Sequence, residues 1–256
     1  MTQKISVIIP NYNDNRIERA LKSLQAQSIT DFELIVVDGG SKEKQVHDTY
    51  EEFASIIDTL IVESDQGLFD ALNKGLNAAT GDYIYLMGAD DFLDNKKTFE
   101  IVYKEITMHL LDGYCIGARF FTSDGTVIRE WMPRKVNPLL IRWGVFPPHF
   151  SLFLSKNIYK EVGYFDLKKG TVGADSYWML LLGKKNYQIK VIPGLYLNME
   201  QGGTSTGSLK NILIAFKNVA ITAKGMGYTN WLLIPIIKVM VKLPQFLMAK
   251  KSPKLF

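Results

Sequence analysis

The first 62 residues alternate between strand-like and helix-like patterns, and this alternation limits the fold more than any other feature. Ile5–Ile9 is a β-branched run that stops at a proline, and residues 32–37 form a second such run. Between them, apolar residues recur at helical spacing over 17–24. A helix over about 43–56 and a strand near 58–62 are expected next. This order predicts a parallel sheet with right-handed crossovers, and therefore an α/β fold.

The middle of the chain adds antiparallel strands to this parallel start. Asp124-Gly125 lies between two strand-like runs, at 114–121 and 126–131, and predicts a hairpin. The expected fold is therefore a mixed central sheet flanked by helices. No GxGxxG motif follows the first strand, which argues against a dinucleotide-binding dehydrogenase. Further elements are expected over 150–154 (strand), 155–163 and 177–182 (helices) and 189–192 (last strand).

Two adjacent carboxylates follow a short apolar strand in the segment 63–91. Ile84–Met87 ends at Gly88-Ala89, and Asp90 and Asp91 come next. Such a pair is costly to bury unless a cation lies against it, and the carboxyl ends of strands are where open α/β sheets bind ligands. Oxygen ligands suit Mg²⁺ or Mn²⁺. The pair predicts a divalent-metal site, with a solvated loop or helix start as the alternative.

The chain's length and cysteine content narrow the class of protein. A chain of 256 residues makes one large domain, or a domain with an appendage. The single cysteine, Cys115, excludes an intramolecular disulfide and a cysteine-based zinc site. The first ten residues run directly into a strand pattern, so we expect no secretory signal peptide.

Charge is distributed unevenly along the chain. Residues 201–256 contain eight lysines and no Asp or Glu, whereas residues 1–200 carry a net charge of −4. A basic tail indicates an anionic partner. Because this tail is also strongly apolar and has no arginine, it fits an anionic membrane surface better than nucleic acid.

Within this tail, residues 231–248 are apolar apart from a narrow polar face made by Lys238, Lys242 and Gln245. Two lysines and two prolines argue against a membrane-spanning helix. We expect residues 206–256 to form a helical tail whose lysines snorkel from a membrane surface. Packing onto the rest of the chain, or onto a second subunit in a homo-oligomer, is the alternative.

Six segments, taken in order, resemble the family 2 inverting glycosyltransferases, which have the GT-A fold. The resemblance covers about residues 4–205 and implies a catalytic domain over 1–205. The segments are Ser6–Asn13, Val36–Ser41, Asp65–Gly75, Gly81–Asp91, Gly163–Asp166 and Ala174-Asp175.

The resemblance implies a nucleotide-sugar donor bound at the carboxyl ends of the first strands. Structural alternatives remain open: Asn13 or Asp14 as a helix cap, Asp38 as a turn former, and Asp70 with Lys74 as a surface ion pair. The donor-binding candidates are Pro10, Asn11, Tyr12, Asn13, Asp38, Asp65, Gly67, Asp70, Lys74, Ala89 and Asp90.

The metal motif departs from the pattern of the family, which is often Asp-x-Asp-Asp or Asn-x-Asp-Asp. The first position here is Gly88, which supplies no side-chain contact. By resemblance, Asp90 is the expected ligand of Mn²⁺ or Mg²⁺ and Asp91 supports it. The cation would neutralise the departing nucleoside diphosphate.

Asp175 is the candidate catalytic base, because the family places the second acid of a Glu-Asp pair there and Ala174 takes the first position. Inverting transfer needs one carboxylate to accept the proton of the acceptor hydroxyl. The alternative is that Asp175 caps the following helix. His149 and Trp178 are weaker acceptor-side candidates, with structural roles as alternatives. Residues 202–205 are expected to form a glycine-rich loop, and a lid is one role for it.

The expected activity is metal-dependent, inverting transfer of a sugar from a UDP-linked donor to a lipid-linked oligosaccharide or polysaccharide precursor. The resemblance extends to members that build capsule, exopolysaccharide or lipopolysaccharide. The expected location is the cytoplasm, on the inner face of the cytoplasmic membrane. Two alternatives stay open: a sugar nucleotidyltransferase, and a non-catalytic binding or scaffold subunit, which Gly88 and Ala174 suggest.

Overall fold

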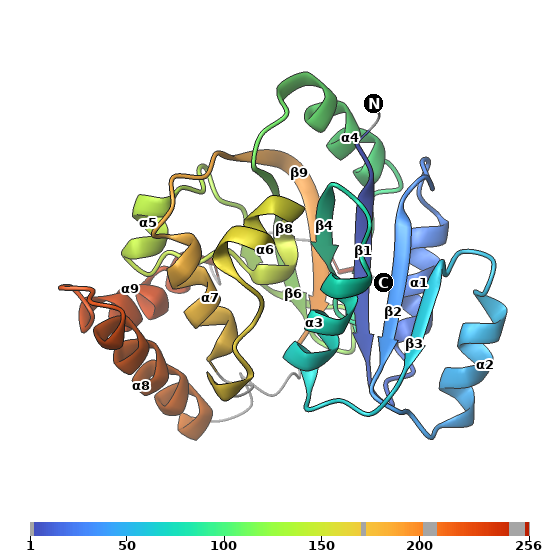
Figure 1. Ribbon diagram of the computed structural model, residues 1–256, viewed down its shortest axis with the longest axis horizontal. Coiled ribbons are helices and arrows are strands. Elements are labelled where there is room, and N and C mark those ends of the chain that lie inside the picture. Colours follow the sequence, from blue (N-terminus) through green and yellow to red (C-terminus); the bar gives the residue numbers. More distant parts are fainter. Residues whose placement is uncertain (1–2, 170–172, 202–208, 246–253, 256) are drawn as a thin grey trace.

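A mixed sheet forms the centre of the molecule (Figure 1). The computed structural model describes residues 3–169, 173–201, 209–245 and 254–255. The described strands run in the order β3-β2-β1-β4-β8-β6-β9-β5, and β7 pairs with β6. They are β1 (Ile5–Asn11), β2 (Glu33–Asp38), β3 (Thr59–Val62), β4 (Tyr83–Leu86), β5 (Asp91–Leu93), β6 (Gly113–Phe121), β7 (Val127–Trp131), β8 (Leu152–Ser155) and β9 (Ile189–Glu200).

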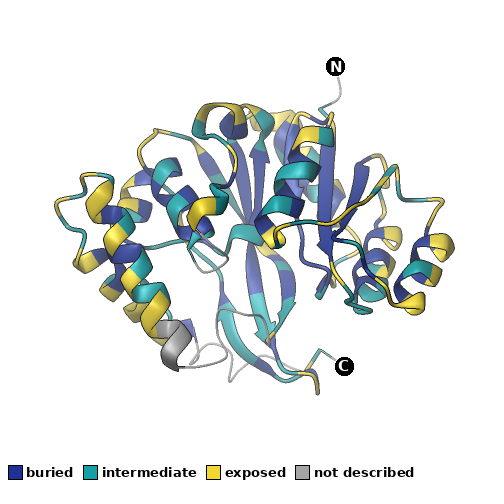
Figure 2. Cartoon of the chain, turned by 60° about the horizontal axis from the view of Figure 1, so that its bottom comes forward, coloured by how far each residue is buried: buried dark blue, intermediate teal, exposed yellow. Residues whose placement is uncertain are grey.

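The parallel start is confirmed, since β1 pairs in parallel with β2 and β4, and β2 with β3. Strands β1, β2 and β4 are buried along their length (Figure 2), and their alternate residues face two separate cores. Val7 and Ile9 pack with one set of helices, whereas Ile8 packs with the other. The first set is α1 (Ile17–Gln25), α2 (Lys44–Glu52) and α4 (Thr98–His109); the second is α3 (Leu68–Ala78), α6 (Lys156–Val162) and α7 (Ala174–Leu182).

The second half of the sheet contains the expected hairpin and one strand that was not expected. β6 and β7 are antiparallel, and Gly125 has a φ of 78° at their turn. β5 is only three residues long and pairs with β9, which runs eight residues beyond the predicted end at 192. Asp91 therefore lies in a strand of the sheet and not in a solvated loop.

Four residues lie side by side across this part of the sheet. Asp91 of β5 pairs with Met199 of β9, which pairs with Phe120 of β6, which pairs with Arg129 of β7. Directly paired residues point to the same face of a sheet. Asp91 and Arg129 therefore face the same side, with three strand spacings, or about 14 Å, between their backbones.

The C-terminal helices α8 (Leu209–Gly225) and α9 (Leu233–Met240) pack against α7. Leu180 of α7 forms a small buried cluster with Val219, Ala223 and Ile234. Among the residues that the structure describes, no helix has the length and apolar character needed to cross a membrane. The loop expected over 202–205 lies outside the described residues.

Helix α9 is oriented opposite to the expectation from its sequence pattern. Lys238 points into the protein, where its Nζ donates to Ser176 Oγ (2.7 Å) and lies over the ring of Phe146. Ile234 and Pro235 are buried, but most of the other apolar residues of α9 face outward. The inward lysine is tolerated because its ammonium group finds a hydroxyl and an aromatic face. The exposed apolar side chains here are Leu232, Leu233, Ile236, Val239, Met240 and Leu243.

Candidate functional site

The carboxyl ends of β1 and β2 are joined by a chain of buried hydrogen bonds. Asn11 Nδ2 donates to the Tyr50 hydroxyl (2.7 Å), which donates to Asp38 Oδ2 (2.6 Å). The other oxygen of Asp38 accepts the N–H groups of Gly40 and Ser41. Burial and the Asp38 carboxylate raise the pKa of Tyr50, so the phenol stays a donor. Asp38 therefore has the turn-forming role; its contact with a base or ribose stays a prediction.

Tyr12 and Asn13 form the loop that follows β1. Asn13 has a φ of 51°, its N–H donates to Ser41 Oγ (2.7 Å), and its Oδ1 accepts the N–H of Lys42 (2.8 Å). Asn13 thus ties two neighbouring loops together and does not cap α1, which Arg16 precedes. Tyr12 is 62% exposed beside this tie, so its ring is free to stack on a nucleobase. Pro10 is buried within β1.

Asp65 and Gly67 lie beside the end of β2. Asp65 Oδ1 accepts the N–H of Gly67 (2.8 Å). The Asp65 carboxylate packs so closely on Gly39 that a Cβ at Gly39 would collide with it. The loops after β1, β2 and β3 are therefore adjacent, as the sequence predicts for the carboxyl edge of a parallel sheet.

Lys74 holds the start of α3. Its Nζ donates to Ser64 O (2.8 Å) and lies 3.1 Å from Glu63 Oε1 and 3.5 Å from Asp70 Oδ2. The Asp70–Lys74 ion pair, one of the alternatives from the sequence, is thus present. Asp70 also accepts the N–H of Gln66. A donor contact for either side chain stays a prediction.

Asp90 and Asp91 fold over Gly88. Asp91 is buried and its Oδ2 accepts the N–H of Gly88 (3.0 Å), whereas the Asp90 side chain is 28% exposed. A Cβ at Gly88 would lie 2.9 Å from an oxygen of each carboxylate, so a side chain there would displace one of them. This packing accounts for glycine at a position where the resembling family often has Asp or Asn. Ala89, between Gly88 and Asp90, is buried.

An arginine pair and a distant glutamate surround these acids. Arg16 makes a bidentate ion pair with Asp14 (2.8 and 2.6 Å) and lies 3.7 Å from Asp90 Oδ2. Arg19 donates to Asp90 O (2.5 Å) and to Glu200 Oε2 (2.8 Å). The sequence analysis missed Arg16, Arg19 and Glu200. No local pattern pairs residues that are 181 positions apart in the chain.

The acid pair fits a divalent cation that is bound together with a phosphorylated ligand. Burial raises the pKa of Asp90, and burial and the charge of Asp90 raise the pKa of Asp91 well above its usual value. Nowhere in the described part of the chain do three His, Cys, Asp or Glu side chains gather as a complete metal cluster. Mg²⁺ is usually held by one or two carboxylates plus substrate phosphates, and Asp90 and Asp91 would supply the carboxylates of such a set.

Asp175 lies in the first turn of α7. Gly173 precedes the helix, so the alternative in which Asp175 caps it was wrong. Its Oδ1 accepts the N–H of Ser176 (2.6 Å), and the side chain is partly exposed. A carboxylate at a helix N-terminus is favoured by the helix dipole and stays available as a proton acceptor.

His149 and Trp178 lie next to Asp175 but differ in role. Trp178 is fully buried and its Nε1 donates to Gly163 O (2.8 Å), so it belongs to the core. The His149 ring packs against Trp178 and Phe165, and its buried Nε2 has no hydrogen-bond partner among the described residues. Burial lowers the pKa of His149 to about 4, although the Asp175 charge acts in the opposite direction. His149 is therefore a neutral, buried imidazole packed beside Trp178.

Asn73 connects α3 to the segment that packs on His149. Its Nδ2 donates to Phe165 O and its Oδ1 accepts the Phe165 N–H, both at 2.9 Å. The Asp-Ala-Leu-Asn-Lys-Gly segment of α3 is thus clamped to the segment that packs on His149.

The sequence matches a known protein family and several known proteins. The family described as Glycosyl transferase family 2 matches residues 6–178. A PGL/p-HBAD biosynthesis glycosyltransferase of Mycobacterium bovis is 31% identical over 167 residues, 64% of this chain and 63% of that protein. An uncharacterized glycosyltransferase of a Nostoc species is 31% identical over 71% of this chain and 61% of its own length. The matches thus span less than two thirds of these relatives.

Solved structures agree on the fold. S. aureus TarS 1–349 in complex with UDP has a TM-score of 0.64 at 23% identity, over 86% of this chain and 65% of that one. Mannosyltransferase PcManGT from Pyrobaculum calidifontis, in complex with GDP-Man and Mn²⁺, has a TM-score of 0.61 at 18% identity, over 97% of this chain and 74% of that one. These likenesses show that the expected mixed α/β fold of GT-A type is correct.

Proposed function

The chain belongs to glycosyl transferase family 2, and we propose that it moves a sugar from a nucleotide-sugar donor, UDP-linked, to a lipid-linked oligosaccharide or polysaccharide precursor with inversion. The observation that carries the proposal is the placement of the Asp90–Asp91 pair on the same edge of the sheet as the loops of Tyr12 and Asp65. Asp175 supplies a separate carboxylate on helix α7. Acids for leaving-group stabilisation and for proton transfer are thus held by different elements.

In the proposed reaction, Asp175 accepts the proton of the acceptor hydroxyl as its oxygen attacks the anomeric carbon. Attack opposite the departing diphosphate inverts the configuration. Asp90 and Asp91 would hold the divalent cation, whose chemistry is to neutralise charge on the leaving group. Arg16 and Arg19 hold the acid pair and its backbone in position. Two GT-A neighbours bound to UDP or to GDP-Man with Mn²⁺ support this assignment.

The decisive test is release of nucleoside diphosphate from a panel of UDP-, GDP- and dTDP-sugars, with Mn²⁺, Mg²⁺ or EDTA, and with donor binding measured in parallel. We expect metal-dependent turnover of a UDP-sugar. Metal-dependent binding without release would mean that the acceptor is missing from the assay. Absence of binding to every donor would overturn the proposal in favour of a scaffold subunit.

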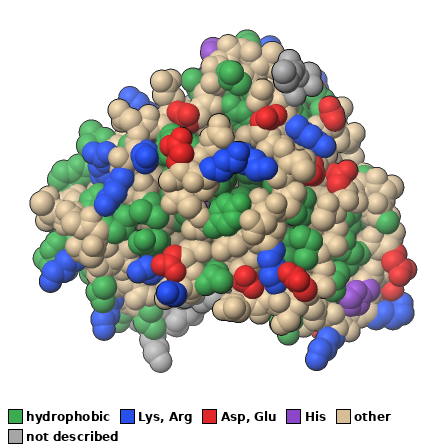
Figure 3. All heavy atoms as spheres, viewed as in Figure 1, with side chains coloured by type: hydrophobic (Ala, Val, Ile, Leu, Met, Phe, Trp, Pro, Cys, Tyr) green, Lys and Arg blue, Asp and Glu red, His purple; other side chains and the backbone are tan. Residues whose placement is uncertain are grey.

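We also propose that the outer face of α9 lies on the anionic inner surface of the cytoplasmic membrane. The support is the row of exposed apolar side chains on α9 and the lysines of the tail. Figure 3 shows hydrophobic side chains reaching the surface on the side where α8 and α9 lie in Figure 1. An amphipathic helix in the interface presents such a face to lipid.

Flotation with vesicles of phosphatidylglycerol and phosphatidylethanolamine tests this placement. Replacing three outer residues of α9 and the turn after it with glutamine should lower membrane partitioning by roughly 10³-fold or more, since each buried apolar side chain contributes roughly 1.5–3 kcal/mol. Equal flotation of this variant and the wild type would contradict the placement. The α9 variant is Ile236→Gln, Val239→Gln and Leu243→Gln; the control is Met108→Gln, Leu110→Gln and Leu139→Gln, which are equally exposed elsewhere.

A further inference from the structure

Three basic side chains converge beside α7, outside the metal and donor elements. Arg129 comes from β7, and Lys238 and Lys242 come from α9 and the turn after it. Together with Phe146 and the buried Gln245 they line a small pocket of about 40 Å³. The pocket exists because α9 turns its polar side inward.

The positive charge of this pocket is not compensated by ion pairs within the described residues. Arg129 stacks 3.4 Å from the centre of the Phe120 ring and donates to Gln245 Oε1 (3.1 Å). Burial lowers the pKa of Arg129 to about 10, and burial and the neighbouring cations lower the pKa of Lys242 to about 8. Asp175 is the carboxylate whose charge opposes this shift at Lys242. Buried cations in excess are stabilised by a bound anion.

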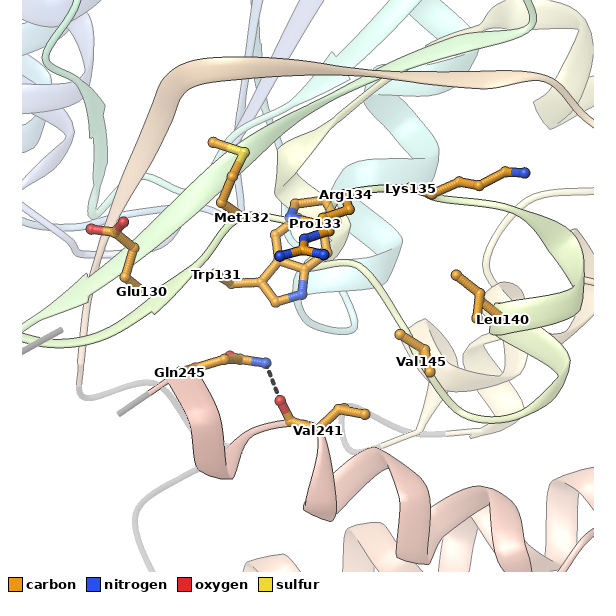
Figure 4. Close-up of a pocket in the computed structure, with 10 residues that line it drawn as sticks. All are labelled: Glu130, Trp131, Met132, Pro133, Arg134, Lys135, Leu140, Val145, Val241 and Gln245. Carbon is orange, nitrogen blue, oxygen red and sulfur yellow. Dashed lines mark hydrogen bonds between the residues drawn. The ribbon is translucent and has the colours of Figure 1, made fainter. Parts of the chain in front are cut away.

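A larger cavity of about 330 Å³ adjoins the pocket, and Trp131, Val241 and Gln245 line both (Figure 4). Arg134 and Lys135 add two more basic side chains to its lining. The acid in this lining, Glu130, is engaged by Arg119 and by the Tyr196 hydroxyl. A ligand in the larger cavity would thus meet basic groups on its way to the small pocket.

We propose that Arg129, Lys238 and Lys242 bind a phosphate group of the acceptor, so that the enzyme glycosylates a phosphate-bearing acceptor. This inference rests on the proposed glycosyltransferase function. Lys238 donates to Ser176, the residue after Asp175, so a phosphate here lies beside the group that accepts the hydroxyl proton. The backbone of Arg129 stands three strand spacings, about 14 Å, from that of Asp91, so the pocket and the acid pair are built on different strands. The phosphate chemistry fits either a prenyl diphosphate or a polyol phosphate.

Lysine footprinting tests the pocket directly. The wild-type protein is saturated with UDP and Mn²⁺, acylated at pH 8, and read by mass spectrometry with inorganic phosphate, farnesyl diphosphate or glycerol 3-phosphate present. We expect the phosphate probes to slow labelling of Lys242 at least fivefold and to leave the exposed Lys217 unchanged. If the concentration that gives half-protection is lower for farnesyl diphosphate than for glycerol 3-phosphate, the acceptor is lipid-linked. If it is lower for glycerol 3-phosphate, the acceptor is a polyol phosphate.

Labelling is also measured without UDP and Mn²⁺, and two results would overturn the inference: unchanged labelling of Lys242 with every probe in both states, or protection that occurs only when UDP and Mn²⁺ are absent. The second result would mean that the pocket binds the nucleotide-sugar donor. Arg129→Gln should abolish protection while retaining UDP binding; if that variant fails to fold, Lys238→Gln serves in its place. Failure to bind UDP in the same samples would count against the proposed function, whereas UDP binding without protection counts against the phosphate pocket alone.

Discussion

Asp175→Asn is expected to lower the turnover number about 10²–10⁴-fold, the range in which a positioned general base accelerates a reaction. Asparagine keeps the size of the side chain and an oxygen that accepts the N–H of Ser176. It cannot take the proton of the acceptor hydroxyl. Nucleoside diphosphate affinity should stay unchanged, because the donor loops lie on other elements. Steady-state kinetics with a fixed acceptor and calorimetric titration of nucleoside diphosphate measure the two quantities.

Glu161→Gln is the matched control for this variant. Glu161 is an acid on the neighbouring helix α6 and bonds the Tyr187 hydroxyl (2.9 Å), outside the proposed site. It should retain wild-type turnover. Loss of the favourable charge at the start of α7 should cost Asp175→Asn only about 0.3–1 kcal/mol of stability. Near-normal turnover in a folded Asp175→Asn protein would exclude Asp175 as the base.

Asp90→Ala is expected to remove metal-dependent turnover, a loss of roughly 10²–10³-fold, comparable to removing one group that stabilises developing charge in a transition state. The folded protein should survive the change, because burial raises the pKa of Asp90 and its ionised form is disfavoured. A raised carboxylate pKa weakens folding as pH rises above the unfolded value of about 4. The metal-free variant should therefore be at least as stable as wild type at neutral pH.

Thermal unfolding with Mn²⁺ or EDTA checks this second prediction. Mn²⁺ should raise the wild-type melting temperature more at pH 7.5 than at pH 5, since protons compete for the raised carboxylates of Asp90 and Asp91. Asp90→Ala should show no such rise at either pH. Asp94→Asn, an acid that pairs with Arg119 nearby, should behave as wild type. Equal Mn²⁺-dependent turnover in Asp90→Ala and wild type would show that Asp90 is not a metal ligand.

The sequence predicted the parallel half of the sheet because its strands are unbroken apolar runs bounded by turn residues. β5 was missed because three residues are too few to show a period, and this placed Asp91 in a loop. Buried hydrogen bonds such as Asn11–Tyr50–Asp38 leave no trace in the sequence, since Tyr50 looks like any helix residue. Local patterns therefore gave the elements but not the contacts between them.

For α9, the amphipathic pattern identified two faces but not which of them packs inward. Lys238 and Lys242 looked like surface lysines, because burial of an ammonium group depends on partners elsewhere in the chain, which for Lys238 are Ser176 and Phe146. Of the candidate site, Asp90 and Asp91 were singled out by their place after a buried strand, and the donor loops and Asp175 by the resemblance. The arginines that hold Asp90, and the basic pocket beside Asp175, required the structure.

The late position of β9 has a consequence for how the protein is made. Asp91 pairs with Met199, and Arg19 reaches Glu200, so the acid pair depends on a strand synthesised more than a hundred positions later. Such non-local pairing slows folding, because the intervening chain must be ordered before the contact forms. A fragment ending at residue 178, where the family match stops, would leave β5 unpaired and an unprotected strand edge at the proposed metal site. Asp90 and Asp91, although translated in the first half of the chain, are therefore fixed in place only once β9 has formed.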